Sequence, residues 1–272
     1  MRFARDAGAD GLVAPGVFGE GAALSLAEQR QVVDTVASEA PGLPVLLGVS
    51  ARTTAVAVEQ AENVLAAARG AGADDVTLMV QINSPRPEVV ATHLQRVHEC
   101  TGAGIVLQDY PLASGVTMPT AGVLQVLEMC PFIAAVKAEA PPTPPAIAAL
   151  TESSGVPVFG GLGGVGLIDE LTAGSAGAMT GFSHPEGLRA TIDAFEAGGF
   201  EAARRTWSPW LPLANFEAQA GIALSLRKTL LHRRGVLDSA RVRPPAPTFP
   251  ASLSALLDQH LVAVTSLHEG AR

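Results

Sequence analysis

Short apolar segments recur along the chain at a nearly constant spacing, and this repeat limits the possible folds more than any other feature. Their successive starts are 33, 32, 28, 29, 24 and 21 residues apart, at Gly11, Pro44, Val76, Gly104, Ile133, Pro157 and Ala178. A stretch with helical periodicity follows each segment, and about 30 residues is the length of one strand–helix unit. Strands with nearly continuous apolar content indicate a parallel sheet buried on both faces. We therefore expect an α/β protein with a closed (β/α)8 TIM barrel rather than an open doubly wound sheet.

The two ends of the chain differ from a complete barrel repeat. Met1–Ala7 reads as the tail of a helix, because the phrase ARDAGADG at Ala4–Gly11 echoes AARGAGADD at Ala67–Asp75, where a helix ends before a strand. We expect the first barrel strand to be missing from this sequence. Either the start codon was placed internally, or the numbering omits upstream residues, or another element fills the gap; the first two predict an apolar strand encoded upstream of Met1. After the last unit the pattern is helical without further strands. The predicted division is an N-terminally truncated barrel over 1–199 and a C-terminal helical region over 200–272.

The charge and composition of the chain exclude several classes of protein. The net charge is −8, from 18 basic and 26 acidic residues, and aromatic residues make up 4%. Such a chain lacks the basic surface and the stacking platform of a nucleic-acid binder. No apolar run approaches the roughly 20 residues of a membrane span, and Met1–Asp10 is not a signal peptide, so we expect a cytoplasmic protein without a membrane partner. Cys100 and Cys130 form no metal-spaced set, so no metal is predicted.

Lys137 is the residue with the clearest chemical potential. It ends the apolar run that starts at Ile133, and Lys228 is the only other lysine among the 18 basic residues. A lysine there is either solvated at the strand tip or partly buried in the barrel mouth, where burial frees the amine as a nucleophile for a carbonyl carbon. Arginine cannot form a Schiff base, so a lysine kept in an arginine-rich chain favours the second interpretation.

Two glycine-rich loops follow predicted strands. Gly16–Gly21 could present backbone N–H groups to a carboxylate or phosphate, or could be a tight strand-to-helix turn. Gly160–Gly164 could bind a phosphate or could leave open space for a substrate over the barrel, and we favour the open space.

The order of these motifs resembles the dihydrodipicolinate synthase / N-acetylneuraminate lyase superfamily. The motifs are G-x-x-G-E at Gly16–Glu20, S-x-R-T-T at Ser50–Thr54, V-K at Val136-Lys137, F-G-G at Phe159–Gly161 and G-A-x-x-G at Gly177–Gly181. The resemblance runs from about Ala7 to Ala263 and includes Arg227-Lys228 near the end. It implies a class I pyruvate-type aldolase, lyase or dehydratase on a (β/α)8 barrel, commonly a tetramer, that needs no metal or organic cofactor.

The resemblance assigns roles to particular residues. Lys137 falls where the family has its Schiff-base lysine. The loop made by Gly16, Val17, Phe18, Gly19 and Glu20 falls where backbone amides hold the carboxylate of a 2-oxo acid. Val17 and Phe18 replace two hydroxyl residues of the family, Gln108 stands at the position of its tyrosine, and Ala113 replaces the arginine that binds a second carboxylate.

Two further residues are candidates for proton transfer. Tyr110 is the only tyrosine and lies two residues beyond Gln108, so it shares a strand face with it. It could act as a general acid/base, or it could be a rim tyrosine hydrogen-bonded to a carbonyl. Glu139 shares the face of Lys137 and could be an acid/base group or the ion-pair partner of the lysine. The predicted catalytic residues are thus Lys137, Tyr110 and Glu139. The predicted substrate-binding residues are Gly16, Val17, Phe18, Gly19, Glu20, Gln108, Gly160, Gly161 and Gly181.

We therefore expect a Schiff-base lyase that acts on pyruvate or another small 2-oxo acid as a homotetramer or homodimer. One alternative is a non-catalytic paralogue of the same barrel that serves as a binding or assembly subunit. A third possibility is a phosphate-binding barrel isomerase that uses Gly160–Gly164.

Overall fold

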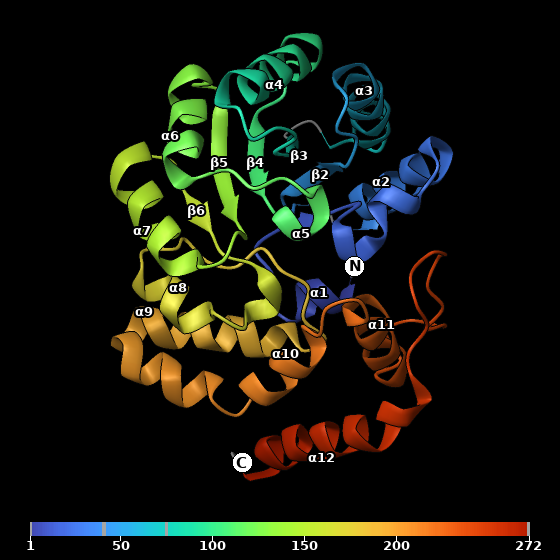
Figure 1. The fold of residues 1–272 in the computed structure, drawn as a ribbon. Coiled ribbons are helices and arrows are strands. Elements are labelled where there is room, and N and C mark those ends of the chain that lie inside the picture. Colours follow the sequence, from blue (N-terminus) through green and yellow to red (C-terminus); the bar gives the residue numbers. More distant parts are fainter. Residues whose placement is uncertain (1, 40–41, 74–75, 271–272) are drawn as a thin grey trace.

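The computed structural model describes residues 2–39, 42–73 and 76–270, and its centre is one parallel sheet (Figure 1). The strands are β1 (Leu12–Val13), β2 (Val45–Val49), β3 (Val76–Gln81), β4 (Ile105–Asp109), β5 (Ile133–Ala138) and β6 (Val158–Phe159). They are hydrogen-bonded in the order β1-β2-β3-β4-β5-β6. Each strand is the spatial neighbour of the next in sequence, so the order never reverses as it would in a doubly wound sheet. This topology is consistent with the expected TIM barrel.

Helices connect and cover the strands. Those between β1 and β6 are α2 (Leu26–Glu39), α3 (Thr54–Gly70), α4 (Pro87–Thr101), α5 (Pro111–Ser114), α6 (Thr120–Met129) and α7 (Thr143–Ser154). The remaining helices are α1 (Arg2–Asp6), α8 (Leu167–Thr172), α9 (Pro185–Trp207), α10 (Leu211–Glu217), α11 (Ala223–Arg233) and α12 (Ser254–Gly270). Single 3-10 turns lie at Val17–Gly19, Gly21–Ala23, Leu162–Gly164 and Ala251–Leu253. Figure 1 shows α9–α12 gathered beside one end of the sheet.

The strand predicted to start at Ala178 is reduced to a single parallel bridge between Gly160 and Ala178. The segment lies beside β6 as expected, but Gly177 adopts φ +141°, which interrupts an extended strand. The Ser175 hydroxyl also accepts hydrogen bonds from the N–H groups of Gly160 (3.1 Å) and Gly177 (3.2 Å). A side chain therefore supplies contacts that a continuous ladder would make with its backbone.

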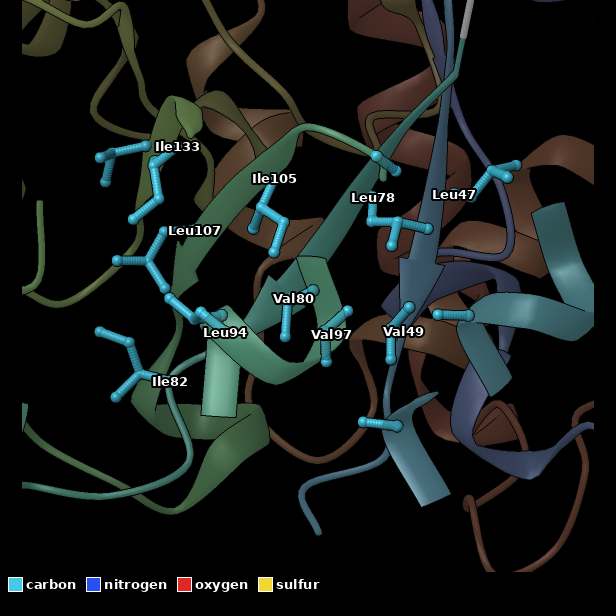
Figure 2. Close-up of a cluster of buried hydrophobic side chains, with 14 of the residues drawn as sticks. Leu47, Val49, Leu78, Val80, Ile82, Leu94, Val97, Ile105, Leu107 and Ile133 are labelled. Carbon is cyan, nitrogen blue, oxygen red and sulfur yellow. The ribbon is translucent and has the colours of Figure 1, made fainter. Parts of the chain in front are cut away.

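The two faces of the sheet have different cores. One face packs against the helices, and Figure 2 shows Leu47, Leu78 and Leu107 of the strands with Leu94 of α4 in this cluster. On the other face a small inner layer is formed by Met79, Val106 and Ala135, with Val13, Leu46, Phe159 and Met179 packed against it. Side chains alternate along a strand, so the residue two positions beyond each inner residue faces the same interior. The next layer above this inner one is therefore formed by Gln81, Gln108 and Lys137.

A third cluster joins the C-terminal helices to the end of the sheet. Trp207 is 1% exposed and packs edge-on against Phe182 at 5.5 Å between ring centroids. The same cluster includes Leu167 and Leu171 of α8 and Leu226 and Leu230 of α11. Helix α9 crosses the predicted boundary at residue 199 and ends at Trp207, with non-helical backbone at Gly198 and Gly199. The division of the chain at residue 199 remains a prediction.

Gly48 allows the loop after β1 to lie against β2. A Cβ atom at Gly48 would overlap the carbonyl oxygen of Pro15. We expect Gly48→Ala to lower the free energy of unfolding by roughly 1–3 kcal/mol, because backbone must move to relieve the overlap. At Gly104 the nearest atom to such a Cβ is 3.9 Å away, so Gly104→Ala is the matched control. Urea unfolding of both variants tests this, and equal losses would contradict it.

Candidate active site

A row of polar side chains crosses the sheet one layer above the inner core. Gln81, Gln108 and Lys137 are partners in register on β3, β4 and β5. Each lies two residues beyond an apolar residue of the inner layer, so these side chains face the same interior. The Lys137 side chain is only 12% exposed. Of the two environments considered for this lysine, the structure shows the largely buried one.

Glu139 contacts two members of this row, Lys137 and Gln108. Its Oε2 lies 2.9 Å from Lys137 Nζ and accepts a hydrogen bond of 2.6 Å from Gln108 Nε2. Its Oε1 accepts a longer bond of 3.4 Å from the Leu162 N–H. Gln81 Nε2 in turn donates to Gln108 Oε1 at 3.4 Å. A carboxylate taken out of water needs such partners, because they offset the cost of its burial.

Tyr110 directly follows β4 and is half-buried. Burial and then the charge of Glu139 raise the pKa of its phenol, while the charge of Arg227 opposes the shift. The phenol is therefore held in its protonated form at neutral pH, where it can donate a hydrogen bond or a proton. The role of Tyr110 as a general acid/base stays a prediction.

Gly160 and Gly161 lie between two carboxylates. A Cβ at Gly160 would overlap the carboxylate of Glu170, and one at Gly161 would overlap that of Glu139. Burial raises the pKa of Glu170, and its Oε1 accepts a 2.6 Å hydrogen bond from the Thr143 hydroxyl, which opposes the shift. Acidic groups at both glycines disfavour a phosphate at this loop, so the phosphate-binding isomerase loses its structural basis.

The loop Gly16–Glu20 is a 3-10 turn fastened to the end of the chain. The Gly16 carbonyl accepts hydrogen bonds from the N–H groups of Gly19 (3.1 Å) and Gly21 (3.0 Å). Glu20 binds Lys228 Nζ at 2.7 Å and the Arg243 N–H at 2.6 Å. Burial acts to raise the pKa of Glu20, but these two partners lower it overall. Glu20 thus anchors the loop to the C-terminal segment.

The other predicted binding residues divide into two groups. Phe18 contacts Gly181, whose added Cβ would lie 3.7 Å from Phe18 Cβ, so these two predicted residues meet. Val17 is 41% exposed, and no described contact links it to Lys137. The structure therefore brings Lys137, Glu139 and Gln108 into direct contact and places the Gly16–Glu20 loop beside Gly181.

Arg227 is a site residue that the sequence reasoning did not assign. It reaches from α11 with a side chain only 5% exposed, and its guanidinium lies 3.7 Å above the Phe18 ring. Its Nε pairs with Glu217 at 3.3 Å. The sequence signal was the pair Arg227-Lys228, noted only as part of the family-like ending. Nothing in the sequence shows that this helix face meets a loop about 200 residues earlier.

Asp109 was also missed, because it lies between two residues that face the interior. It is 6% exposed, and its Oδ1 has no hydrogen-bond partner among the described residues. Burial and the charge of Glu139 raise its pKa to about 6. The available signal was an acidic residue in a strand whose five positions are all buried.

In the described part of the chain, no three His, Cys, Asp or Glu side chains lie close enough to hold a metal ion together. None of the described helices combines the length and the apolar character that a bilayer requires.

Fold and site together define an α/β protein of parallel strand–helix units. A buried lysine–glutamate pair lies on the sheet face that carries the inner layer. The chain belongs to the Dihydrodipicolinate synthetase family, whose sequence profile matches residues 1–261. It is 29% identical over 254 residues to L-2-keto-3-deoxyarabonate dehydratase of Azospirillum brasilense, covering 90% of this chain and 80% of that one. It is 30% identical over 262 residues to 4-hydroxy-tetrahydrodipicolinate synthase of Synechococcus sp. (strain WH7803), covering 93% and 83%.

A solved structure gives the same result for the fold. Dihydrodipicolinate synthase from Rhodopseudomonas palustris superposes with a TM-score of 0.85 at 27% identity, covering 96% of this chain and 88% of that one. The family and these relatives support a lyase of the pyruvate-dependent aldolase type.

The raised pKa of Asp109 predicts a specific pH dependence of stability. Between pH about 4 and about 6 the folded protein binds more protons at Asp109 than the unfolded chain does, so the free energy of unfolding falls as pH rises. Asp109→Asn removes this titration. Relative to the wild type, the variant should gain up to about 3 kcal/mol between pH 4 and pH 7. Urea unfolding across that range measures the difference, and a difference independent of pH would contradict the burial of an ionisable Asp109.

Proposed function

We propose that this protein is a class I lyase that forms a Schiff base between Lys137 and a small 2-oxo acid. The observation that carries the proposal is the buried contact of Lys137 Nζ with Glu139 Oε2 at 2.9 Å, in an interior row that Gln108 completes. An amine nucleophile needs a neighbouring group to accept its proton, and this carboxylate is within direct reach. The membership of the chain in a family of such enzymes supports the same chemistry.

The first step joins the amine to the ketone. Glu139 accepts a proton from the Lys137 ammonium, and the neutral amine attacks the ketone carbon to give a carbinolamine. Loss of water, with a proton returned to the leaving hydroxyl, gives the iminium ion. The iminium then accepts the electron pair of a bond broken at the neighbouring carbon. The Tyr110 phenol, which is protonated at neutral pH, supplies and recovers protons in these steps.

The departures from the family pattern bear on the substrate. Val17 and Phe18 carry no hydroxyl, so proton transfer falls to Tyr110 and Glu139. Ala113, at the position of the arginine that binds a second carboxylate in the family, is exposed on α5. A second substrate with a carboxylate at that position is therefore disfavoured. A keto-deoxy sugar acid, the class named in the dehydratase from Azospirillum brasilense, fits this site better than a second substrate that carries its own carboxylate.

The resemblance also supports an assembly and a compartment. We propose a homo-oligomer, a tetramer or a dimer, located in the cytoplasm. Light scattering of the purified protein would measure the assembly directly.

The nucleophile can be identified because the chain has only two lysines. Treatment with pyruvate and sodium borohydride should give a reduced adduct on Lys137, located by intact mass and peptide mapping. Lys137→Arg keeps a cation next to Glu139 but should abolish the adduct. Lys228→Arg keeps the cation next to Glu20 and should retain it. If folded wild-type protein forms no adduct with pyruvate or other 2-oxo acids, the non-catalytic paralogue becomes the better interpretation.

The role of Glu139 is tested by the rate of imine formation. Glu139→Gln cannot accept the lysine proton, so trapping at neutral pH should slow by about 100-fold, the typical contribution of a general base. The matched control is Glu170→Gln, which neutralises another buried carboxylate that contacts Gly160 rather than Lys137. Rapid-quench trapping measures both rates. Faster trapping in Glu139→Gln would mean that the glutamate only holds the lysine in its charged form.

A further inference from the structure

Arg227 carries a donor that the protein itself does not use. Its side chain is 5% exposed, and Nε pairs with Glu217, but Nη1 has no hydrogen-bond partner within the described residues. Leaving a buried charged donor unpaired costs more than leaving a neutral one unpaired, so such atoms are rare unless they serve a ligand.

The surroundings place Arg227 at the site. The guanidinium stacks over Phe18 at 3.7 Å, and its Nη2 lies 2.5 Å from where a Cβ of Gly163 would be. Phe18 belongs to the loop after β1, and Gly163 to the loop after β6, so Arg227 lies between two loops that follow strands of the sheet. Its charge also acts on Tyr110, whose pKa it lowers against the effect of burial.

The pairing of Arg227 with Glu217 does not account for its orientation. Glu217 is fully buried and already accepts hydrogen bonds from the Ser183 N–H, at 3.1 Å, and from the Ser183 hydroxyl. An arginine placed only to neutralise this carboxylate would be expected to bind it through two parallel N–H groups. Here Glu217 contacts the guanidinium only through Nε, and Nη1 has no hydrogen-bond partner among the described residues.

We propose that Arg227 binds the carboxylate of the 2-oxo acid through Nη1. The inference rests on the proposed function and deepens it by assigning the residue that recognises the substrate's charge. The resemblance assigns this carboxylate to backbone N–H groups of the Gly16–Glu20 loop, which carry no full charge. The side chains of Val17 and Phe18 add no donor, and Lys228 is engaged by Glu20. Arg227, stacked on Phe18, supplies a cation beside those N–H groups. A guanidinium also matches the planar shape of a carboxylate.

The test uses oxamate, which has the shape and carboxylate of pyruvate but an amide in place of the methyl ketone, and oxamide, its neutral analogue. Neither depends on an imine with Lys137. Calorimetric titration should show that the wild type binds oxamate more tightly than oxamide. The variant is R227Q combined with E217Q, so that no unpaired buried carboxylate remains. It should bind oxamate about 10- to 100-fold more weakly and oxamide unchanged, as expected for loss of one charge-assisted hydrogen bond.

Two comparison variants separate this role from a structural one. E217Q alone keeps the guanidinium but weakens the contact at Nε that positions it, so it should reduce oxamate binding less than R227Q/E217Q does. R233Q removes another arginine of α11 that is ion-paired, in its case to Asp258 of α12, and should leave oxamate binding unchanged. Thermal unfolding of each variant confirms that it is folded before titration.

The outcomes distinguish the two proposals. Unchanged oxamate binding in R227Q/E217Q, an equal loss of oxamate and oxamide, or no oxamate binding by the wild type would each overturn the role of Arg227. If instead oxamate binding depends on Arg227 while pyruvate gives no borohydride adduct, the carboxylate site stands and the Schiff-base function of Lys137 fails.

Discussion

The interaction on which the site depends is the buried ion pair of Lys137 and Glu139. Removing two charges from water is unfavourable unless their remaining hydrogen-bonding positions are filled, and here Gln108 and the Leu162 N–H fill them. Gly161 must lack a side chain because the Glu139 carboxylate occupies the place of its Cβ. The pair thus fixes the identity of one loop residue and the orientation of its neighbours.

The charge of Glu139 acts well beyond its lysine. It raises the pKa values of Asp109, Tyr110 and Glu170, in each case together with a larger effect of burial. One anion therefore favours the protonated forms of three neighbours. The charge of Arg227 opposes this effect at Tyr110, whose pKa it lowers. The proposed carboxylate contact at Nη1 would use this second buried cation, because the charge of Lys137 is already compensated by Glu139.

The sequence predicted the parts of the fold that depend on local periodicity. Apolar segments at Pro44, Val76, Gly104 and Ile133 became β2–β5, and the alternation of side chains put Glu139 on the face of Lys137, where the two form an ion pair. The segment at Ala178 became only a bridge, because Gly177 and the Ser175 hydroxyl replace the regular ladder there. The sequence did not predict the role of Arg227, for a different reason. Its partners, Phe18 and Glu217, lie on other elements, and no periodicity relates them.

The C-terminal helices therefore belong to the site as well as to its support. Successive residues of a helix point about 100° apart, so two neighbours can contact different parts of one loop. On α11, Arg227 stacks on Phe18 while Lys228 binds Glu20, and both contacts fall within the Gly16–Glu20 loop. Any shift of α11 would move the loop and its cation together. The proposed recognition of a carboxylate would in this way be coupled to the packing of a helix distant in sequence, whereas Lys137 lies on β5 and pairs with Glu139 just beyond that strand.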